Sequence, residues 1–275
     1  MEVTPTYKIG RIAKHFYEEP CISGKSGSGA VFFAGCTMKC CYCQNYRLSR
    51  GLIGQSYTED ELVDGMLRLQ DEGALNINFV TPSPYAVYLP HIIERARIKG
   101  LKLPIVYNTS AYENVETIKK LDGLIDVYLP DFKYIDEEDG RLLSGVKDYP
   151  SIATRVIDEM VRQCPGYVFK EDKDPENGEL MKKGVIVRHL ILPERTKKSM
   201  RAIEFLHERY GEKIYISLMN QYTPFGDVAR AKGLERPLTK REYEKVVNYA
   251  IDLGITKAYI QEGTTASESF IPTFS

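Results

Sequence analysis

The sequence predicts an α/β fold: a partial barrel of the (β/α)6 type, with parallel strands and an opening on one side. The first observation is that short apolar runs alternate with longer stretches of helical periodicity, the pattern of βαβ units. The second is that about six or seven such units fit, whereas a complete barrel needs eight. The third is that no linker or internal repeat divides the 275 residues, so we expect a single domain.

Each predicted strand is a short apolar run, and each predicted helix is a stretch with apolar residues on one face. The predicted strands span residues 30–34, 76–80, 105–108, 124–129, 185–192, 214–218 and 258–260. The predicted helices span residues 58–73, 85–99, 111–121, 151–164, 197–210 and 239–253. Thr58 and Glu61 form a capping box at the start of the first helix.

Three segments depart from this rhythm. Residues 1–25 show no clear periodicity, and we expect them to wrap the barrel formed by residues 26–260. The charged stretch 170–183 contains Pro, Asn and Gly, which predicts an exposed hairpin or insertion loop. Residues 261–275 are expected to form a C-terminal tail.

The composition is that of a folded, soluble protein, with 43% hydrophobic and 27% charged residues. With a net charge of −1, the protein has no broad positive electrostatic potential that would attract nucleic acid or an acidic membrane surface. Residues 1–11 lack the apolar core of a signal peptide, and no apolar run is long enough to span a bilayer. We therefore expect a cytoplasmic protein that binds neither nucleic acid nor membranes.

The strongest chemical signal is a cysteine loop, since four of the six cysteines fall within residues 36–43. Thiolates are soft ligands that suit iron–sulfur clusters and zinc. The spacing CxxxCxxC of Cys36, Cys40 and Cys43 lets three thiolates on one curled loop reach three corners of a cubane cluster. The loop supplies no fourth ligand, so one iron would remain open for a chelating substrate.

Two other interpretations of this loop remain. Structural zinc normally takes four ligands, often from two separated cysteine pairs, and here Cys21 and Cys164 stand alone. Cys41 is available as a fourth ligand, although adjacent cysteines point apart. A zinc site would make the chain a noncatalytic binding protein. A disulfide or a chance group of buried thiols is the other alternative, and it is unusual in a cytosolic chain.

The loop from Gly35 to Asn45 resembles the signature of the radical S-adenosylmethionine (SAM) superfamily. This resemblance implies a radical SAM partial barrel, an oxidoreductase whose [4Fe-4S] cluster is held by Cys36, Cys40 and Cys43, with SAM chelating the open iron. An external donor such as flavodoxin or ferredoxin would reduce the cluster, and SAM would be cleaved to methionine and a 5′-deoxyadenosyl radical. Such chemistry is oxygen-sensitive.

The resemblance also implies SAM contacts on the same loop. The aromatic residue before the last cysteine, Tyr42, would lie near the adenine. Gln44 and Asn45 resemble a His-Asn pair of pyruvate formate-lyase activating enzyme. Together with the short barrel and the Asp131-x-Lys133 element, this pair makes the chain resemble a glycyl-radical activating enzyme, which implies that it abstracts hydrogen from a backbone glycine of a partner enzyme. Modification of a small molecule or of another peptide is the alternative within the superfamily.

Sites on parallel α/β folds gather at the carboxyl ends of strands, so we expect cofactor-binding residues at the predicted strand ends. Thr81 and Ser83 stand where much of the superfamily has Gly-Gly-Glu, and they offer hydroxyls and carbonyls for the SAM amino group. An ordinary proline-rich turn is the other interpretation of this position. Asn108 and Thr109 resemble a segment that faces the nucleoside.

The later strands carry charges at corresponding positions. Asp131 and Lys133 resemble an Asp-x-Lys element of the activating enzymes that binds a cation and SAM, although a simple ion pair would also explain them. Arg188 resembles a strand arginine that reaches the cofactor carboxylate, and a buried charge there needs a partner. The adjacent His189 faces the other way and is expected to be structural. Gln221 is expected to line the adenine or the substrate channel.

Overall fold

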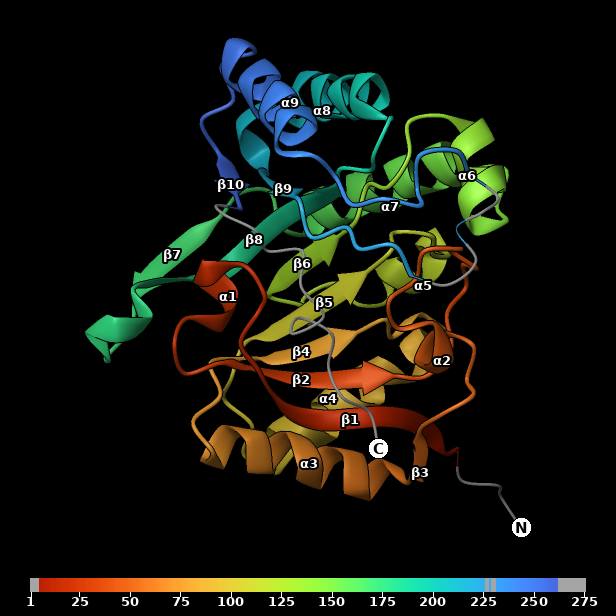
Figure 1. Cartoon of the computed structure of the whole chain (residues 1–275). Helices are drawn as coiled ribbons and strands as arrows, with labels where there is room; N and C mark the ends of the chain where they lie inside the picture. The colour runs from red at the N-terminus through yellow and green to blue at the C-terminus, as the bar shows by residue number, and fades with distance from the viewer. Residues whose placement is uncertain (1–4, 226–227, 229–230, 262–275) are drawn as a thin grey trace.

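The computed structural model describes residues 5–225, 228 and 231–261 (Figure 1). Its strands are β1 (Tyr7–His15), β2 (Ser28–Phe33), β3 (Gln55–Tyr57), β4 (Ile77–Val80), β5 (Ile105–Thr109), β6 (Val127–Pro130), β7 (Val168–Glu171), β8 (Glu179–Leu190), β9 (Tyr215–Met219) and β10 (Ala258–Ile260). Its α-helices are α1 (Pro20–Ser23), α2 (Tyr46–Ser49), α3 (Glu59–Asp71), α4 (Leu89–Ile98), α5 (Val115–Lys119), α6 (Glu137–Ser144), α7 (Tyr149–Gln163), α8 (Thr196–Tyr210) and α9 (Lys240–Asp252). Three short 3-10 helices are η1 (Ser83–Tyr88), η2 (Pro175–Asn177) and η3 (Gly211–Lys213).

The strands form one sheet in the order β10-β9-β8-β6-β5-β4-β2-β1-β3, with β7 paired to β8. All neighbours from β2 to β10 along this order are parallel. In the described residues the sheet ends at β3 on one side and at β10 on the other. The predicted α/β fold with a mostly parallel, unclosed sheet is therefore confirmed.

Several local expectations are also confirmed. Thr58 caps α3 through a complete capping box with Glu61. The charged stretch forms a hairpin in which β7 pairs antiparallel with the first part of β8. The helix expected at 85–99 divides into η1 and α4, since Pro90 lies in the first turn of α4 and cannot donate a helical hydrogen bond.

The short elements β3, α1 and α2 lie outside the predicted ranges, and two longer elements were also not expected. Residues 7–15, which were placed in an N-terminal wrap, form β1, antiparallel to both β2 and β3. Lysine and arginine interrupt the apolar alternation of this strand, and its pairing with β2 determines its conformation. Helix α6 is the other, because its first turn is three acidic residues with little apolar periodicity. Of the expected tail, all but Gln261 lies outside the described residues.

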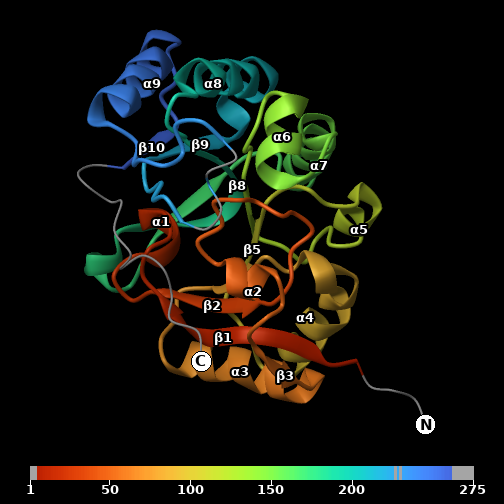
Figure 2. The same cartoon turned by 45° about the vertical axis from the view of Figure 1, so that its right-hand side comes forward.

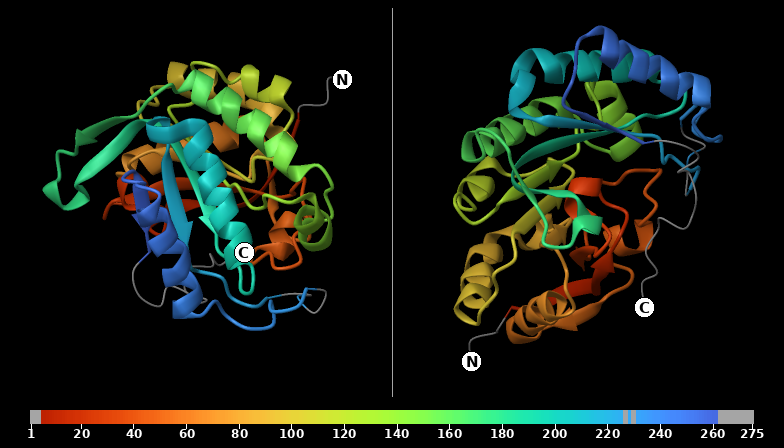
Figure 3. Two further views of the ribbon diagram at one scale, coloured as in Figure 1. Left: turned by 90° about the horizontal axis from the view of Figure 1, so that it is seen from above. Right: turned by 90° about the vertical axis from the view of Figure 1, so that its left-hand side faces the viewer.

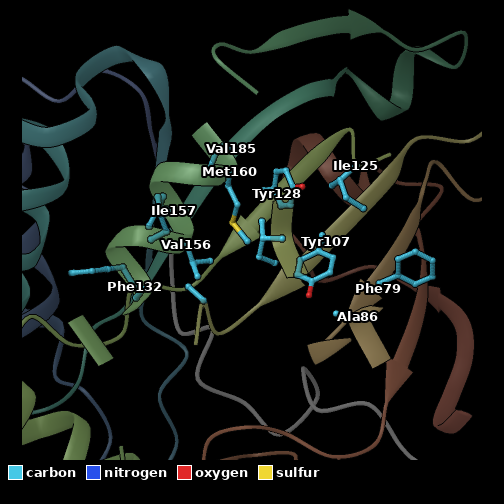
Figure 4. Close-up of a cluster of buried hydrophobic side chains, with 14 of the residues drawn as sticks. Phe79, Ala86, Tyr107, Ile125, Tyr128, Phe132, Val156, Ile157, Met160 and Val185 are labelled. Atoms are coloured by element: carbon cyan, nitrogen blue, oxygen red, sulfur yellow. The ribbon is translucent and has the colours of Figure 1, made fainter. Parts of the chain in front are cut away.

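The outer face of the sheet is apolar and covered by helices. Figure 4 shows Phe79 of β4, Tyr107 of β5 and Tyr128 of β6 in this layer, with Met160 of α7 packed beside them. All four side chains are fully buried. Neighbouring residues of a strand point to opposite faces of the sheet. On each of these strands, the residues directly before and after the aromatic therefore point into the barrel.

The inner face is closed at the amino ends of the strands by α1. Cys21 and Ile22 of this helix pack against Val106, Val127 and Ile186, one each from β5, β6 and β8. Figure 1 shows α1 beside the tails of the strand arrows, and Figure 3 shows the same arrangement from the side. The carboxyl ends of the strands lie at the opposite end of the barrel, toward α2. Within the described ranges, none of the helices has both the length and the apolar character needed to cross a membrane.

Candidate active site

A cavity of about 610 Å³ lies on the inner face of the sheet, between α1 and the cysteine loop. It brings together residues from both ends of the described chain. Nearly all of the predicted site residues line it: Cys36, Cys40, Tyr42, Cys43, Asn45, Thr81, Asn108, Thr109, Asp131, Lys133, Arg188 and Gln221. Ser83 is the exception and is absent from the cavity wall.

The cysteine loop follows β2 and is held by backbone contacts to distant segments. The amides of Lys39 and Cys41 donate to the carbonyls of Ser144 and Leu143 at the end of α6. Gly35, at the start of the loop, has a φ of +92°, a conformation that favours glycine. Figure 2 shows α2, directly after this loop, in front of the sheet. Helix α6, which the sequence did not predict, therefore fixes the position of the loop.

The three predicted cluster ligands face the cavity, and Cys41 is absent from the cavity wall. Burial raises the pKa of Cys36 to about 11, and burial also raises the pKa of Cys40. No three His, Cys, Asp or Glu side chains in the described residues converge on a point suited to one metal ion. Three thiols that face one cavity fit a cluster, because each thiolate of a cluster binds a different iron.

A chain of hydrogen bonds runs from Tyr42 to the cysteines. The hydroxyls of Tyr42 and Tyr134 lie 2.6 Å apart, and those of Tyr134 and Ser144 also lie 2.6 Å apart. Ser144 in turn donates to Sγ of Cys40 at 2.9 Å. Tyr42 is therefore fixed by its hydroxyl while its ring borders the cavity, as a residue that contacts a flat base requires.

Asp131 lies between two cations on the cavity wall. Nζ of Lys133 donates to Oδ2 of Asp131 at 2.6 Å, and Nε of Arg188 donates to Oδ1 at 3.0 Å. Burial by itself would raise the pKa of Asp131, but the two cations outweigh it and the pKa is lowered. The buried charge of Arg188 thus has protein partners, as burial requires. Lys133 keeps donors for a further anion.

The turn after β4 has an unusual backbone. Thr81 has a φ of +55°, in the left-handed region that favours glycine, at the position where the superfamily resemblance implies a glycine-rich segment. Ser83 donates to Oε1 of Glu113 at 2.6 Å, and Thr109 donates to the same oxygen at 2.5 Å. The Ser83 hydroxyl is thus bonded to Glu113 and is absent from the cavity wall, and its contact with the cofactor stays a prediction.

His189 is structural, as predicted. It is 3% exposed on the outer face of β8. Its Nδ1 lies 2.7 Å from the carbonyl oxygen of Phe132, and its Nε2 lies 2.9 Å from the Ser199 hydroxyl. Burial lowers the pKa of His189. With both ring nitrogens bonded and the side chain away from the cavity, this histidine connects β8 to α8.

Gln221 and the cysteine loop meet across the cavity, although the two segments are far apart in sequence. Nε2 of Gln44 donates to the backbone carbonyl of Gln221 at 3.2 Å. Oδ1 of Asn45 is buried and has no hydrogen-bond partner. An unpaired acceptor on a cavity wall requires a donor, so this atom marks a point where a ligand would be held.

Sequence reasoning missed three acidic residues at this site. Glu18 and Glu19 lie in the turn before α1 and line the cavity, and Glu113 holds Ser83 and Thr109. None of them belongs to a motif or stands at the carboxyl end of a predicted strand. The one available signal was the Glu-Glu-Pro sequence at residues 18–20, which resembles an ordinary helix start.

The radical SAM superfamily profile matches residues 30–168, which is half of the chain and includes the cysteine loop, Asp131 and Lys133. This chain belongs to the radical SAM superfamily. The cofactors of this radical SAM protein are a [4Fe-4S] cluster and S-adenosylmethionine. The three cavity-facing thiols, the unpaired Asn45 oxygen and the free donors of Lys133 fit these groups.

Two curated relatives share part of the sequence. An uncharacterized protein of Methanocaldococcus jannaschii is 27% identical over 230 residues, which are 81% of this chain and 62% of that protein. Pyruvate formate-lyase-activating enzyme of Clostridium pasteurianum is 27% identical over 129 residues, or 45% of this chain and 53% of the enzyme. The radical SAM chain described here therefore spans less than two thirds of the length of either relative.

Solved structures support the fold. SuiB of Streptococcus suis, in complex with its precursor peptide SuiA, matches with a TM-score of 0.54 at 15% identity. The match covers 84% of this chain and 48% of SuiB. At this identity the similarity concerns the arrangement of strands and helices, and it agrees with the open parallel sheet.

Proposed function

We propose that this chain is an enzyme that cleaves SAM reductively at a [4Fe-4S] cluster held by Cys36, Cys40 and Cys43. We further propose that it activates a glycyl-radical enzyme by taking a hydrogen atom from a backbone glycine. The observation that supports this proposal is that the three thiols share one cavity with the buried cations of Lys133 and Arg188.

The cavity residues divide into anion-binding and base-binding groups. Lys133 has donors left over from its ion pair and would hold the methionine carboxylate of SAM. Arg188 would contribute mainly its field, since Asp131, Glu18 and Asn108 already accept its hydrogen bonds. Asp131 keeps both cations in place, so it orients rather than contacts the carboxylate.

The other predicted contacts surround the nucleoside and the amino group. Tyr42 would border the adenine, and the free oxygen of Asn45 would accept a hydrogen bond from the ligand. Thr81 would present its backbone to the amino group, in the glycine-like conformation that it adopts. Asn108, Thr109 and Gln221 complete the wall around the ribose and the adenine.

Cluster and SAM together, once reduced by one electron, supply a radical that can abstract hydrogen from an unactivated C–H bond. The chain's part is to exclude water and to aim the substrate. Phe32, Phe33, Leu48 and Leu190 line the cavity with apolar surface. Cytoplasmic flavodoxin or ferredoxin would be a suitable electron donor.

Two observations favour a glycine of a partner protein as the substrate. The chain is similar over 129 residues to the pyruvate formate-lyase-activating enzyme of C. pasteurianum. The sheet is unclosed in the described residues, which leaves a lateral side for a peptide segment to approach. Other peptides or a small molecule are the alternatives that the experiment must separate.

The test is anaerobic reconstitution with iron and sulfide, reduction with dithionite, and EPR spectroscopy with and without SAM. We expect a reduced-cluster signal that changes on SAM addition, followed by release of methionine and 5′-deoxyadenosine. Tightly bound zinc without iron uptake would contradict the proposal and favour a structural site. Mixing with a purified glycyl-radical enzyme precursor should then yield a protein-based glycyl radical. If SAM is cleaved but no glycyl radical forms, the proposed partner is wrong and the proposed SAM cleavage stands.

A further inference from the structure

The end of the cavity opposite the cysteine loop is formed by two adjacent glutamates. Glu18 and Glu19 lie in the turn between β1 and α1, which covers the amino ends of the parallel strands (Figure 1). The Glu18 side chain is 7% exposed and Glu19 is 8% exposed. Both line the cavity. The two residues share a location, yet their surroundings differ.

Glu18 is fully satisfied by protein groups. Its Oε1 accepts hydrogen bonds from Nδ2 of Asn78 and Nδ2 of Asn108, each at 3.1 Å. Its Oε2 forms an ion pair with Arg188 at 3.0 Å. Three donors from three different strands therefore hold this carboxylate, and its role is to fix the base of the barrel.

Glu19 is not satisfied in this way. Its Oε2 is buried and has no hydrogen-bond partner. Burial raises the pKa of Glu19, while the nearby Arg188 and a hydrogen bond with Ser217 oppose the rise only in part. A buried carboxylate oxygen without a donor is costly, so a donor supplied by a bound group would stabilise it.

The charges around the cavity leave the same residue unbalanced. The charged side chains that line it are the carboxylates of Glu18, Glu19 and Asp131 and the cations of Lys133 and Arg188. Lys133 pairs with Asp131, and Arg188 bridges Asp131 and Glu18. With Glu19 ionised, the charged side chains of the described cavity wall are three carboxylates and two cations, and Glu19 is the carboxylate without an ion pair.

The neighbouring histidine does not supply that cation. His15 lines the same end of the cavity, but burial, with help from Arg11 and Arg188, lowers its pKa to about 4. It is therefore uncharged at neutral pH.

We propose that Glu19 binds a positively charged group of the substrate, an ammonium or a guanidinium, at the amino end of the barrel. This inference depends on the proposed function in one respect: the substrate must lie in the cavity opposite the cysteine loop. It adds a requirement: the part of the substrate that reaches the amino end of the barrel carries a cationic group. A charge-assisted hydrogen bond to the free Oε2 supplies the recognition.

The test compares two probes of nearly equal shape, butylguanidinium and its neutral isostere butylurea. Binding is measured calorimetrically to the reconstituted, SAM-loaded protein. We expect the wild-type chain to prefer the cation by about tenfold, the factor that the weaker of the measured close charge pairs at interfaces contribute. Glu19→Gln should bind both probes equally. Glu171→Gln, a matched change at an exposed residue of β7, should keep the preference.

Three outcomes would overturn the inference. The first is that the wild-type chain binds both probes equally or binds neither. The second is that Glu19→Gln, with its melting temperature unchanged, keeps the preference for the cation. The third is that Glu19→Gln loses SAM affinity, which would assign Glu19 to the cofactor site. Failure of the proposed function is separate, because it is detected in the wild-type chain as the absence of any SAM effect on the cluster spectrum.

Discussion

The two faces of the sheet show how one set of strands serves two purposes. On β5, Tyr107 packs outward into the helix-covered core, and the next residue, Asn108, points inward to accept a hydrogen bond from Arg188. On β8, Val187 points outward and Arg188 inward. The outer face is apolar and contributes stability, while the inner face carries the buried charges beside an apolar contact with α1. The alternation of side chains therefore separates folding from chemistry residue by residue.

The largest effect is expected from substitutions in the cysteine loop. Cys36→Ala, Cys40→Ala and Cys43→Ala should each abolish the cluster, because these thiols line the cavity. Cys41→Ala should retain it, because Cys41 is outside the cavity wall and packs against the core. Iron and sulfide content after anaerobic reconstitution is the measurement. A cluster lost in the Cys41 variant and kept in one of the others would reverse the assignment.

A change on the inner face should affect both stability and chemistry. Asp131→Asn leaves the buried cations of Lys133 and Arg188 short of a carboxylate. We expect the free energy of unfolding to fall by about 3–5 kcal/mol, and 5′-deoxyadenosine formation to fall with it. Asp158→Asn is the matched control, since Asp158 pairs with Arg209 at the surface and should cost at most about 1 kcal/mol. Equal losses in the two variants would argue against a buried charge network.

A change on the outer face should affect stability alone. Phe79→Ala removes a fully buried ring from the core and should lower the free energy of unfolding by about 3–5 kcal/mol. Cluster content and SAM binding of the folded fraction should remain those of the wild type. Chemical denaturation and EPR spectroscopy provide the two measurements. If this variant folds normally but fails to bind SAM, the two faces are not separable as we describe.

The smallest prediction concerns pH. The pKa of His15 is lowered from 6.5 to about 4, mainly by burial. Between these values the unfolded chain takes up a proton that the folded chain does not, so the free energy of unfolding should fall as pH falls. His15→Asn should make this dependence shallower in urea denaturation at several pH values. Phe79→Ala should leave the slope unchanged. A steeper slope in the His15 variant would show that the sign is wrong.

The site divides between what local sequence encodes and what distant contacts create. The CxxxCxxC loop, the capping box of Thr58 and the opposite directions of Arg188 and His189 depend on residues within a few positions of one another. Each could be predicted, because spacing and strand alternation act locally. The position of Asp131 and Lys133 at a strand end followed from the same reasoning.

The sequence by itself thus determined the fold class, the cysteine loop and twelve of the residues that line the cavity. Only the tertiary structure decided that Ser83 bonds to Glu113, that α6 anchors the cysteine loop, and that Glu18 and Glu19 lie near Arg188. Glu18 and Arg188 are 170 positions apart. No periodicity or local propensity encodes a contact over that separation, because it forms only when the whole sheet brings the two segments together.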